Sequence, residues 1–178
     1  MNKSGENCAG LRAVFTSPIL RNSIIWGNEV SNGPAAAAQI DCKSYDARYC
    51  CIQDLQPHLR VGGNIAADPL FADSAAGDYH LKSQGGRYDP AAQVWVTDEV
   101  TSPAIDAGDP LAPIGTEPFA NGGIINIGAY GQTAQASKAW FGTAPCQTIV
   151  AGDINGDCTV NLADMAILSR HWLTDFGQ

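Results

Sequence analysis

Basic residues are scarce in this chain of 178 residues. Lys and Arg number 10 against 18 Asp and Glu, and they are scattered singly, so the formal net charge is -8. A protein that binds nucleic acid neutralises phosphates with clustered Lys and Arg. The composition therefore argues against nucleic acid as a partner.

Long apolar runs and zinc-type cysteine spacing are missing as well. No stretch approaches the roughly 20 apolar residues that a membrane-spanning helix needs, so no span is expected. The cysteines form no CxxC pair, and their even number favours disulfides in an oxidising compartment. The six are Cys8, Cys42, Cys50, Cys51, Cys146 and Cys158.

Two cysteine pairings are suggested by position. Cys146 and Cys158 flank one loop and are candidates for a bridge. Cys50 and Cys51 alternate across a strand, so one should face inward and the other outward, where it could pair with Cys42.

Residues 1–7 lack the apolar centre of a signal peptide. We therefore expect the tail of a longer secreted polypeptide, extracellular or at the cell surface.

The familiar catalytic signatures are also lacking. The chain has no GxSxG elbow, no phosphate-binding loop and no GxGxxG segment. Its histidines are far apart in sequence and are expected to be surface or strand residues: His58, His80 and His171. Two carboxylate pairs would suit glycosidic cleavage but lie in turn-like contexts beside Gly or Pro: Asp106 with Asp109, and Asp68 with Asp73. No catalytic residue is assigned.

Turn residues and short β-prone runs are abundant. The chain has 19 Gly and 10 Pro, and only 16% of its residues are charged, which favours short strands over long exposed helices. Runs such as 23–28 and 49–53 are bounded by Asn, Gly, Asp or Pro, as strand ends should be. Paired apolar residues flanked by Asn or Gly favour a solenoid over a sandwich or barrel. The expected fold class is mainly β.

The composition divides the chain into three parts. Residues 1–134 contain the short β-prone segments, and residues 135–151 have the character of a linker. Residues 152–178 combine a polar Asp/Asn/Gly loop with a helical pattern over 162–173. The apolar residues of that pattern are Leu162, Met165, Leu168 and Trp172.

The strongest chemical signal lies in the loop 153–164. Oxygen-bearing side chains recur at its positions 1, 3, 5, 9 and 12, and position 7 adds a backbone carbonyl. These predicted ligands are Asp153, Asn155, Asp157, Thr159, Asn161 and Asp164. A loop coiled around Ca²⁺ needs this alternation, because every second residue faces the ion. Ile154, Val160 and Leu162 lie between ligands and are expected to anchor the loop to a core.

This segment resembles one repeat of a type I dockerin, in which a calcium loop precedes a short helix. The resemblance implies Ca²⁺ as the cofactor and a cohesin-like protein as a partner. Cys158 takes position 6, where glycine is usual, and the chain has one repeat where dockerins generally have two. The single repeat weakens the expectation of a cohesin-like partner and leaves that of calcium binding.

The rest of the chain resembles another family over roughly residues 15–134. The matching segments, in order, are 22–28, 63–71, 77–81, 102–109 and 125–131. They are similar to the last coils and C-terminal cap of secreted bacterial right-handed parallel β-helix proteins, the pectate-lyase-like group. The resemblance implies a β-helix end with an irregular cap, followed by the calcium-loop–helix module. It also implies action on, or binding to, extracellular polysaccharide.

The resulting functional prediction is a non-catalytic C-terminal part of an extracellular, polysaccharide-associated β-helix protein. Its calcium-binding module would serve stabilisation or attachment. Two alternatives stay open: the tail of a polysaccharide lyase or glycoside hydrolase with catalytic coils upstream, and a stand-alone carbohydrate-binding module. Few coils precede the cap, which makes the groove short for catalysis.

Overall fold

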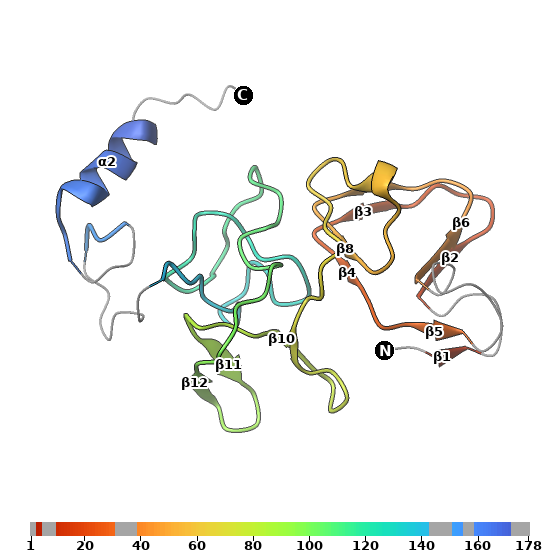
Figure 1. The fold of residues 1–178 in the computed structure, drawn as a ribbon, viewed down its shortest axis with the longest axis horizontal. Helices are drawn as coiled ribbons and strands as arrows, with labels where there is room; N and C mark the ends of the chain where they lie inside the picture. The colour runs from red at the N-terminus through yellow and green to blue at the C-terminus, as the bar shows by residue number, and fades with distance from the viewer. Residues whose placement is uncertain (1–2, 5–9, 31–38, 143–150, 155–158, 172–178) are drawn as a thin grey trace. The chain divides into compact units, whose positions relative to one another are not determined.

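The computed structural model describes residues 3–4, 10–30, 39–142, 151–154 and 159–171 (Figure 1). The chain divides into two compact units, Met1–Ala139 and Trp140–Gln178. The described strands all belong to the first unit and the described α-helix to the second. Their bounds are β1 Lys3–Ser4, β2 Leu11–Ala13, β3 Ile19–Arg21, β4 Ile24–Ile25, β5 Glu29–Val30, β6 Ile40–Cys42, β7 Asp46–Arg48, β8 Cys51–Ile52, the 3₁₀-helix η1 Pro57–Leu59, β9 Phe71–Asp73, β10 Asp78–Leu81, β11 Arg87–Asp89, β12 Val94–Val96 and α2 Leu162–His171.

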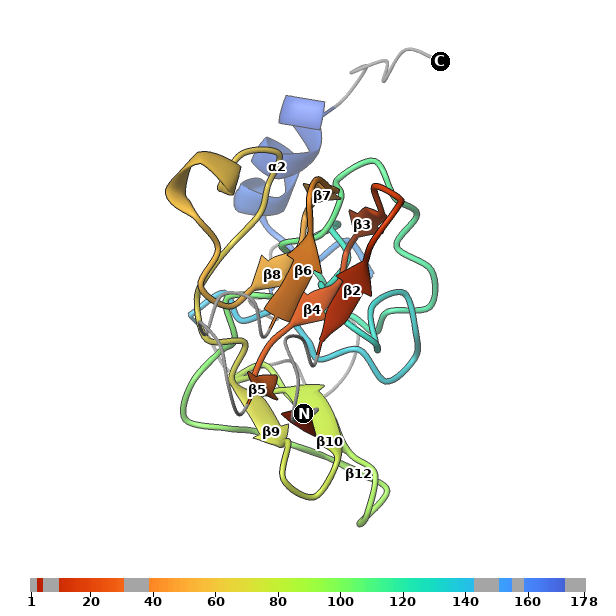
Figure 2. The same cartoon turned by 90° about the vertical axis from the view of Figure 1, so that its right-hand side faces the viewer.

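Four parallel strand pairs form the N-terminal part of the first unit. β1 pairs with β5, β2 with β6, β3 with β7 and β4 with β8 (Figure 2). The register aligns Ile24 with Cys51 and Ile25 with Ile52, so apolar side chains share a face on neighbouring strands. The strands are short because turns interrupt them. Asn22 and Gly27, on either side of β4, both adopt positive φ.

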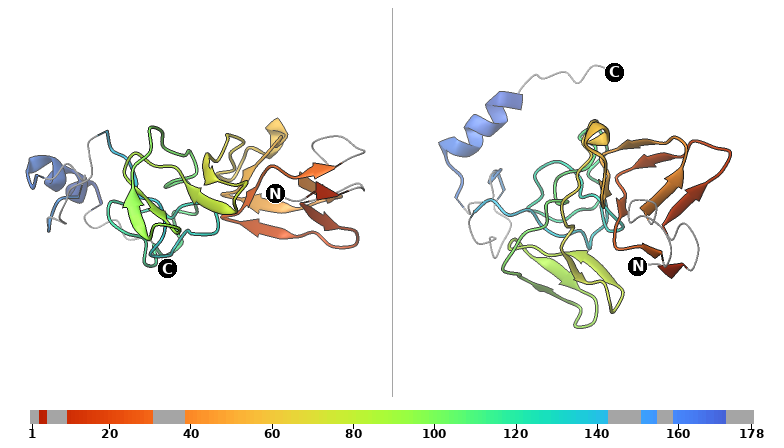
Figure 3. Two further views of the ribbon diagram at one scale, coloured as in Figure 1. Left: turned by 90° about the horizontal axis from the view of Figure 1, so that it is seen from below. Right: turned by 45° about the vertical axis from the view of Figure 1, so that its right-hand side comes forward.

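Two antiparallel hairpins follow, β9–β10 and β11–β12, and they lie next to one another (Figure 3). In the first turn the Asp73 carboxylate accepts the Ala76 N–H at 3.1 Å. In the second, the Asp89 carboxylate accepts the N–H groups of Ala91 and Ala92 at 2.9 and 3.1 Å. Aspartates that bond nearby backbone in this way close tight turns.

The described residues of the first unit bury two clusters of apolar side chains. Cys51, Leu81, Ala104 and Ile127 form the first, and Cys50, Ile52 and Leu55 form the second. Cys50 and Cys51 are both fully buried. The prediction that one of them faces outward is wrong, because apolar side chains cover both faces of the chain at this point. Both are free thiols, so neither is bridged to Cys42.

The mainly β class is confirmed, but the predicted β-helix end is not formed. Each described sheet has two strands, and the contact that extends a pair is a single bridge between Cys51 and Ile65. After β8 the chain passes through turns with positive φ at Asp54, Gly62 and Gly63. It forms η1 between Asp54 and Gly62, and antiparallel hairpins follow in place of a further stacked coil. No closed or solenoid sheet runs through the described part of the chain.

Residues 97–142 are held by turns and hydrogen bonds, with no strand assigned. The Ile127 N–H donates to the Ala104 carbonyl, and the Gly108 N–H donates to the Ile125 carbonyl, each at 2.9 Å. These bonds join the turn 104–108 to the segment 125–127. Ala104 and Ile127 are fully buried, so the pairing closes one side of the first core cluster.

The second unit contains α2, which begins inside the predicted helical pattern at Leu162. The proposed loop anchors are exposed: Ile154 by 40%, Val160 by 54% and Leu162 by 80%. The prediction that they bury against a core is wrong. Among the described residues of this unit, the buried side chains are those of Asp153 and Asp164. No helix in the described ranges is long and apolar enough to cross a membrane. Cys146, Cys158 and Trp172 lie outside those ranges.

Candidate functional site

Asp164 organises the described part of the predicted calcium loop. It is the third residue of α2 and is 2% exposed. One carboxylate oxygen accepts the Ile154 N–H at 2.7 Å, and the other accepts the Asn161 N–H at 2.8 Å. The side chain of Asp164, at position 12 of the loop, therefore joins positions 2 and 9. The Asn161 side chain in turn accepts the Ala163 N–H at 2.7 Å and caps the helix.

Four of the six predicted ligands fall in the described ranges. Asp153 is 4% exposed, whereas Thr159 and Asn161 are exposed. The Thr159 carbonyl accepts a bond of 3.3 Å from the Asn161 side-chain amide. Asn155 and Asp157 lie outside the described residues. Within those residues, no group of three or more His, Cys, Asp and Glu is placed to bind a metal.

The donor set at the loop ends suits a hard cation. Ca²⁺ takes six to eight oxygen ligands from carboxylates and carbonyls. Asp153 and Asp164 bury two carboxylates at the first and twelfth loop positions. Burying a carboxylate is costly unless hydrogen bonds or a cation stabilise the charge. The positive dipole end of α2 stabilises the Asp164 carboxylate, which lies in the first turn of the helix.

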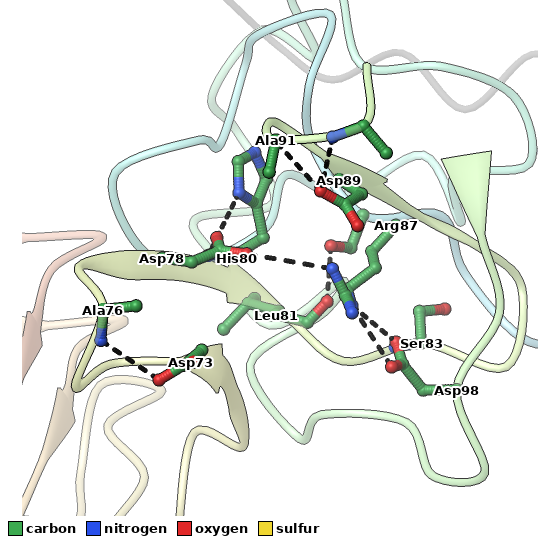
Figure 4. A network of polar contacts seen from close by, with 12 residues as sticks. Asp73, Ala76, Asp78, His80, Leu81, Ser83, Arg87, Asp89, Ala91 and Asp98 are labelled. Atoms are coloured by element: carbon green, nitrogen blue, oxygen red, sulfur yellow. Dashed lines mark hydrogen bonds and ion pairs between the residues drawn. The ribbon is translucent and has the colours of Figure 1, made fainter. Parts of the chain in front are cut away.

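A separate polar network surrounds His80 in the first unit (Figure 4). His80 Nδ1 lies 2.6 Å from the Asp78 carboxylate, and its ring stacks on Tyr130 at 3.6 Å between centroids. The other Asp78 oxygen lies 3.8 Å from the Arg87 guanidinium. Arg87 Nε contacts both oxygens of Asp98 at 3.1 and 3.0 Å. The network joins β10 to β11 and to the segment after β12.

The geometry of this network indicates a structural role. The His80 side chain is fully buried, and its Nε2 has no hydrogen-bond partner among the described residues. A general base must reach a substrate proton, and this nitrogen does not face solvent. His80 is a strand residue, as the sequence predicted. Its pairing with Asp78 follows from their spacing, because residues i and i+2 of a strand share a face.

The aspartates that the sequence suggested as carboxylate pairs bond backbone N–H groups in turns. Asp68 accepts the Leu70 N–H and Asp109 accepts the Leu111 N–H, each at 2.9 Å. Asp73 closes the β9–β10 turn. Asp106 instead accepts the Gly122 N–H at 3.1 Å and donates its own N–H to the Asn126 side chain at 2.9 Å, contacts that sequence reasoning missed. No spacing rule links these residues, since they meet only through the irregular turns of residues 97–142.

Comparison with known proteins gives one family. Residues 19–108, just over half of the chain, match the family described as "Disaggregatase related". The chain belongs to the disaggregatase-related family. No curated protein and no solved structure matches it. The match runs from β3 to Gly108, so it includes Asp78, His80, Arg87 and Asp98 and excludes Tyr130 and the loop 153–164.

Membership of the disaggregatase-related family corrects both resemblances drawn from sequence. The chain is not a pectate-lyase-like right-handed β-helix followed by a dockerin repeat. The segments that suggested this, such as 22–28 and 102–109, are short apolar runs bounded by turns, and they form two-stranded pairs and turns here. Polysaccharide association and a cohesin-like partner were implied by those resemblances and lose that support.

Proposed function

We propose that the loop 153–164 binds one Ca²⁺ ion and that the ion stabilises the second unit of this disaggregatase-related protein. The observation that supports the proposal is the burial of Asp153 and Asp164, with Asp164 closing the loop onto Ile154 and Asn161. The spacing of the six oxygen ligands in the sequence adds to it. The exposed apolar residues of α2 add little packing energy, so the ion supplies the missing stabilisation.

The second part of the proposal is an extracellular location. Calcium loops of extracellular modules bind with dissociation constants of roughly 10⁻⁴ to 10⁻³ M, which matches the free calcium available outside cells. Asn161 is engaged in capping α2, and position 6 is cysteine. A loop with these features is expected to bind in that weak range. The ion would then be bound outside the cell and absent inside it.

Calcium titration by calorimetry on the intact chain tests the site. We expect one ion per chain, with binding reduced at least about 100-fold by Asp153→Asn, which keeps the side-chain size and removes one ligand charge. At free calcium 100 times the dissociation constant, the second unit should gain about 2.7 kcal/mol of stability. Thermal unfolding followed by circular dichroism measures that gain.

A matched control and a competing ion sharpen the result. Asp73→Asn makes the same chemical change at an exposed turn residue and should leave calcium binding unaltered. Mg²⁺ should bind far more weakly, because it demands a small octahedral shell. Absence of binding in the intact chain, or equal binding by Asp153→Asn, would show the loop to be only a helix cap.

A further inference from the structure

Residues 121–123 form a turn with the sequence Asn-Gly-Gly, in which hydrogen bonds hold both ends of the Asn121 side-chain amide. Its Nδ2 donates to the Glu117 carbonyl at 3.1 Å. Its Oδ1 accepts the Gly123 N–H at 3.4 Å. Gly123 has a φ of 77°, which a residue with a Cβ rarely adopts. The Asn121 side chain therefore lies beside the backbone that follows it.

An asparagine followed by glycine can react with its own backbone. The Gly122 nitrogen and the Asn121 Cγ are linked through only three atoms, so a bond between them closes a five-membered succinimide ring. Glycine has no side chain to obstruct this approach. The reaction is slow in an ordinary peptide, because the amide nitrogen is a poor nucleophile until a base removes its proton.

Asp106 places a carboxylate oxygen on the proton of the attacking nitrogen. Its Oδ2 accepts the Gly122 N–H at 3.1 Å, within the reach of about 2.6 to 3.2 Å that a general base needs. The N–H lies in the peptide plane, whereas the nitrogen attacks Cγ with electrons perpendicular to that plane. A Cβ on Gly122 would overlap the same Asp106 oxygen, so glycine also permits this close approach.

The surroundings of Asp106 make it a better base than an exposed aspartate. Its Oδ1 is buried and has no hydrogen-bond partner in the described structure. Burial raises the pKa of Asp106 from the usual value of about 4 to about 7, and the negative charge of Glu117 adds to the rise. Ionisable groups on neighbouring segments have partners of their own: Asp109 with Leu111, Tyr130 with His80, and Lys138 with Trp95.

The two hydrogen bonds of the Asn121 amide suit the remaining parts of the reaction. Negative charge develops on Oδ1 as the nitrogen attacks Cγ, and the Gly123 N–H donates to that oxygen. The Glu117 carbonyl holds the Nδ2 that departs. Gly122 and Gly123 are exposed, so water can reach the ring once it has formed.

We propose that Asp106 and residues 121–123 form a self-modification site, at which Asp106 is the general base for cyclisation of Asn121. The Asp106 carboxylate takes the Gly122 proton as the N–Cγ bond forms. The Cγ–Nδ2 bond then breaks, and Nδ2 leaves as ammonia with that proton. Water opens the succinimide at one of its two carbonyls, which produces aspartate or isoaspartate at position 121. Water is the only co-reactant.

The modification changes the turn permanently. A carboxylate replaces the amide that donated to the Glu117 carbonyl, and its negative charge arises next to that of Asp106. Isoaspartate also adds a methylene group to the backbone of the turn. Both changes loosen residues 121–123 from Asp106 and Glu117. The fraction of modified chains therefore records the time since folding.

Mass spectrometry of digested protein, sampled during incubation at mildly alkaline pH, measures the rate at position 121. We expect Asp106→Asn to slow the reaction by about 100-fold, the lower end of what a general base contributes. Asparagine keeps an acceptor for the Gly122 N–H and removes the basicity. Asp109→Asn is the matched control, because its carboxylate bonds the Leu111 N–H, and it should leave the rate unchanged.

Two further rates test the role of Asp106 without any variant that must fold. A synthetic peptide with the sequence of residues 118–126 has the Asn-Gly pair and lacks the base. Its rate should be lower and should rise in proportion to hydroxide concentration. The rate in the intact chain should rise as Asp106 ionises and level off above about pH 7. The Asn-Gly pairs at 32–33 and 155–156 report on the incubation itself and should react equally in wild type and Asp106→Asn.

Three outcomes would overturn the proposal. The first is a rate in the intact chain no higher than that of the peptide, which would mean that the turn protects Asn121. The second is an unchanged rate in Asp106→Asn. The third is a rate in the intact chain that keeps rising with hydroxide concentration above pH 7, because hydroxide and not Asp106 would then remove the Gly122 proton.

Discussion

Replacing Asn64 by alanine is expected to lower the free energy of unfolding of the first unit by about 4 kcal/mol. The Asn64 side chain is buried and accepts the Cys50 N–H at 3.0 Å. Its amide donates to the carbonyls of Ala47, Leu59 and Val61 at 2.7, 3.1 and 2.8 Å. Alanine leaves the buried Cys50 N–H and the partly buried carbonyls without these partners, and a buried group left unsatisfied costs about 1 to 3 kcal/mol.

Urea unfolding of the two chains measures this loss. Gln56→Ala is the matched control, because Gln56 is exposed in the same stretch of chain and removing its amide should change stability by less than about 0.5 kcal/mol. We expect Asn64→Asp to be intermediate, since it keeps the acceptor for Cys50 and loses the donors. A cost for Asn64→Ala equal to that of Gln56→Ala would contradict the bonding seen around Asn64.

Short apolar runs and turn residues in the sequence predicted the strands and turns well. They predicted poorly how the strands assemble into sheets. The run 23–28 is apolar between turn residues, and β4 forms inside it. Asp68, Asp73 and Asp109 close turns because aspartate bonds backbone a few residues ahead, which needs no knowledge of the fold. The solenoid failed because it requires a repeat of constant length, and the chain after β8 changes from parallel pairing to hairpins.

The candidate sites show the same contrast between features set by nearby residues and features that depend on distant ones. The calcium loop stays a prediction, and it could be made from the sequence because its ligands lie within twelve consecutive residues. The anchoring of Leu162 was predicted wrongly because helical spacing says which residues share a face and not what covers that face. The bonds of Asp106 to Gly122 and Asn126 could not be predicted, since they join turns that are far apart in the sequence.

Replacing Gly85 by alanine is expected to destabilise the first unit by about 3 kcal/mol. Gly85 is buried where the segment 137–139 packs on residues 83–86. A Cβ at this position would overlap the Ala139 carbonyl oxygen and would lie 3.1 Å from that of Lys138. Backbone cannot move aside as a flexible side chain can. The Ser83 hydroxyl, which donates to the Lys138 carbonyl at 2.5 Å, ties the two segments together.

Gly77→Ala is the control that separates packing from backbone conformation. Gly77 has a φ of 84° in the β9–β10 turn, and a Cβ there would meet no atom within 4 Å. Its substitution should cost about 1 kcal/mol from the strained φ alone. Thermal unfolding should therefore rank Gly85→Ala clearly below Gly77→Ala. The reverse ranking would mean that residues 137–139 do not pack on residues 83–86.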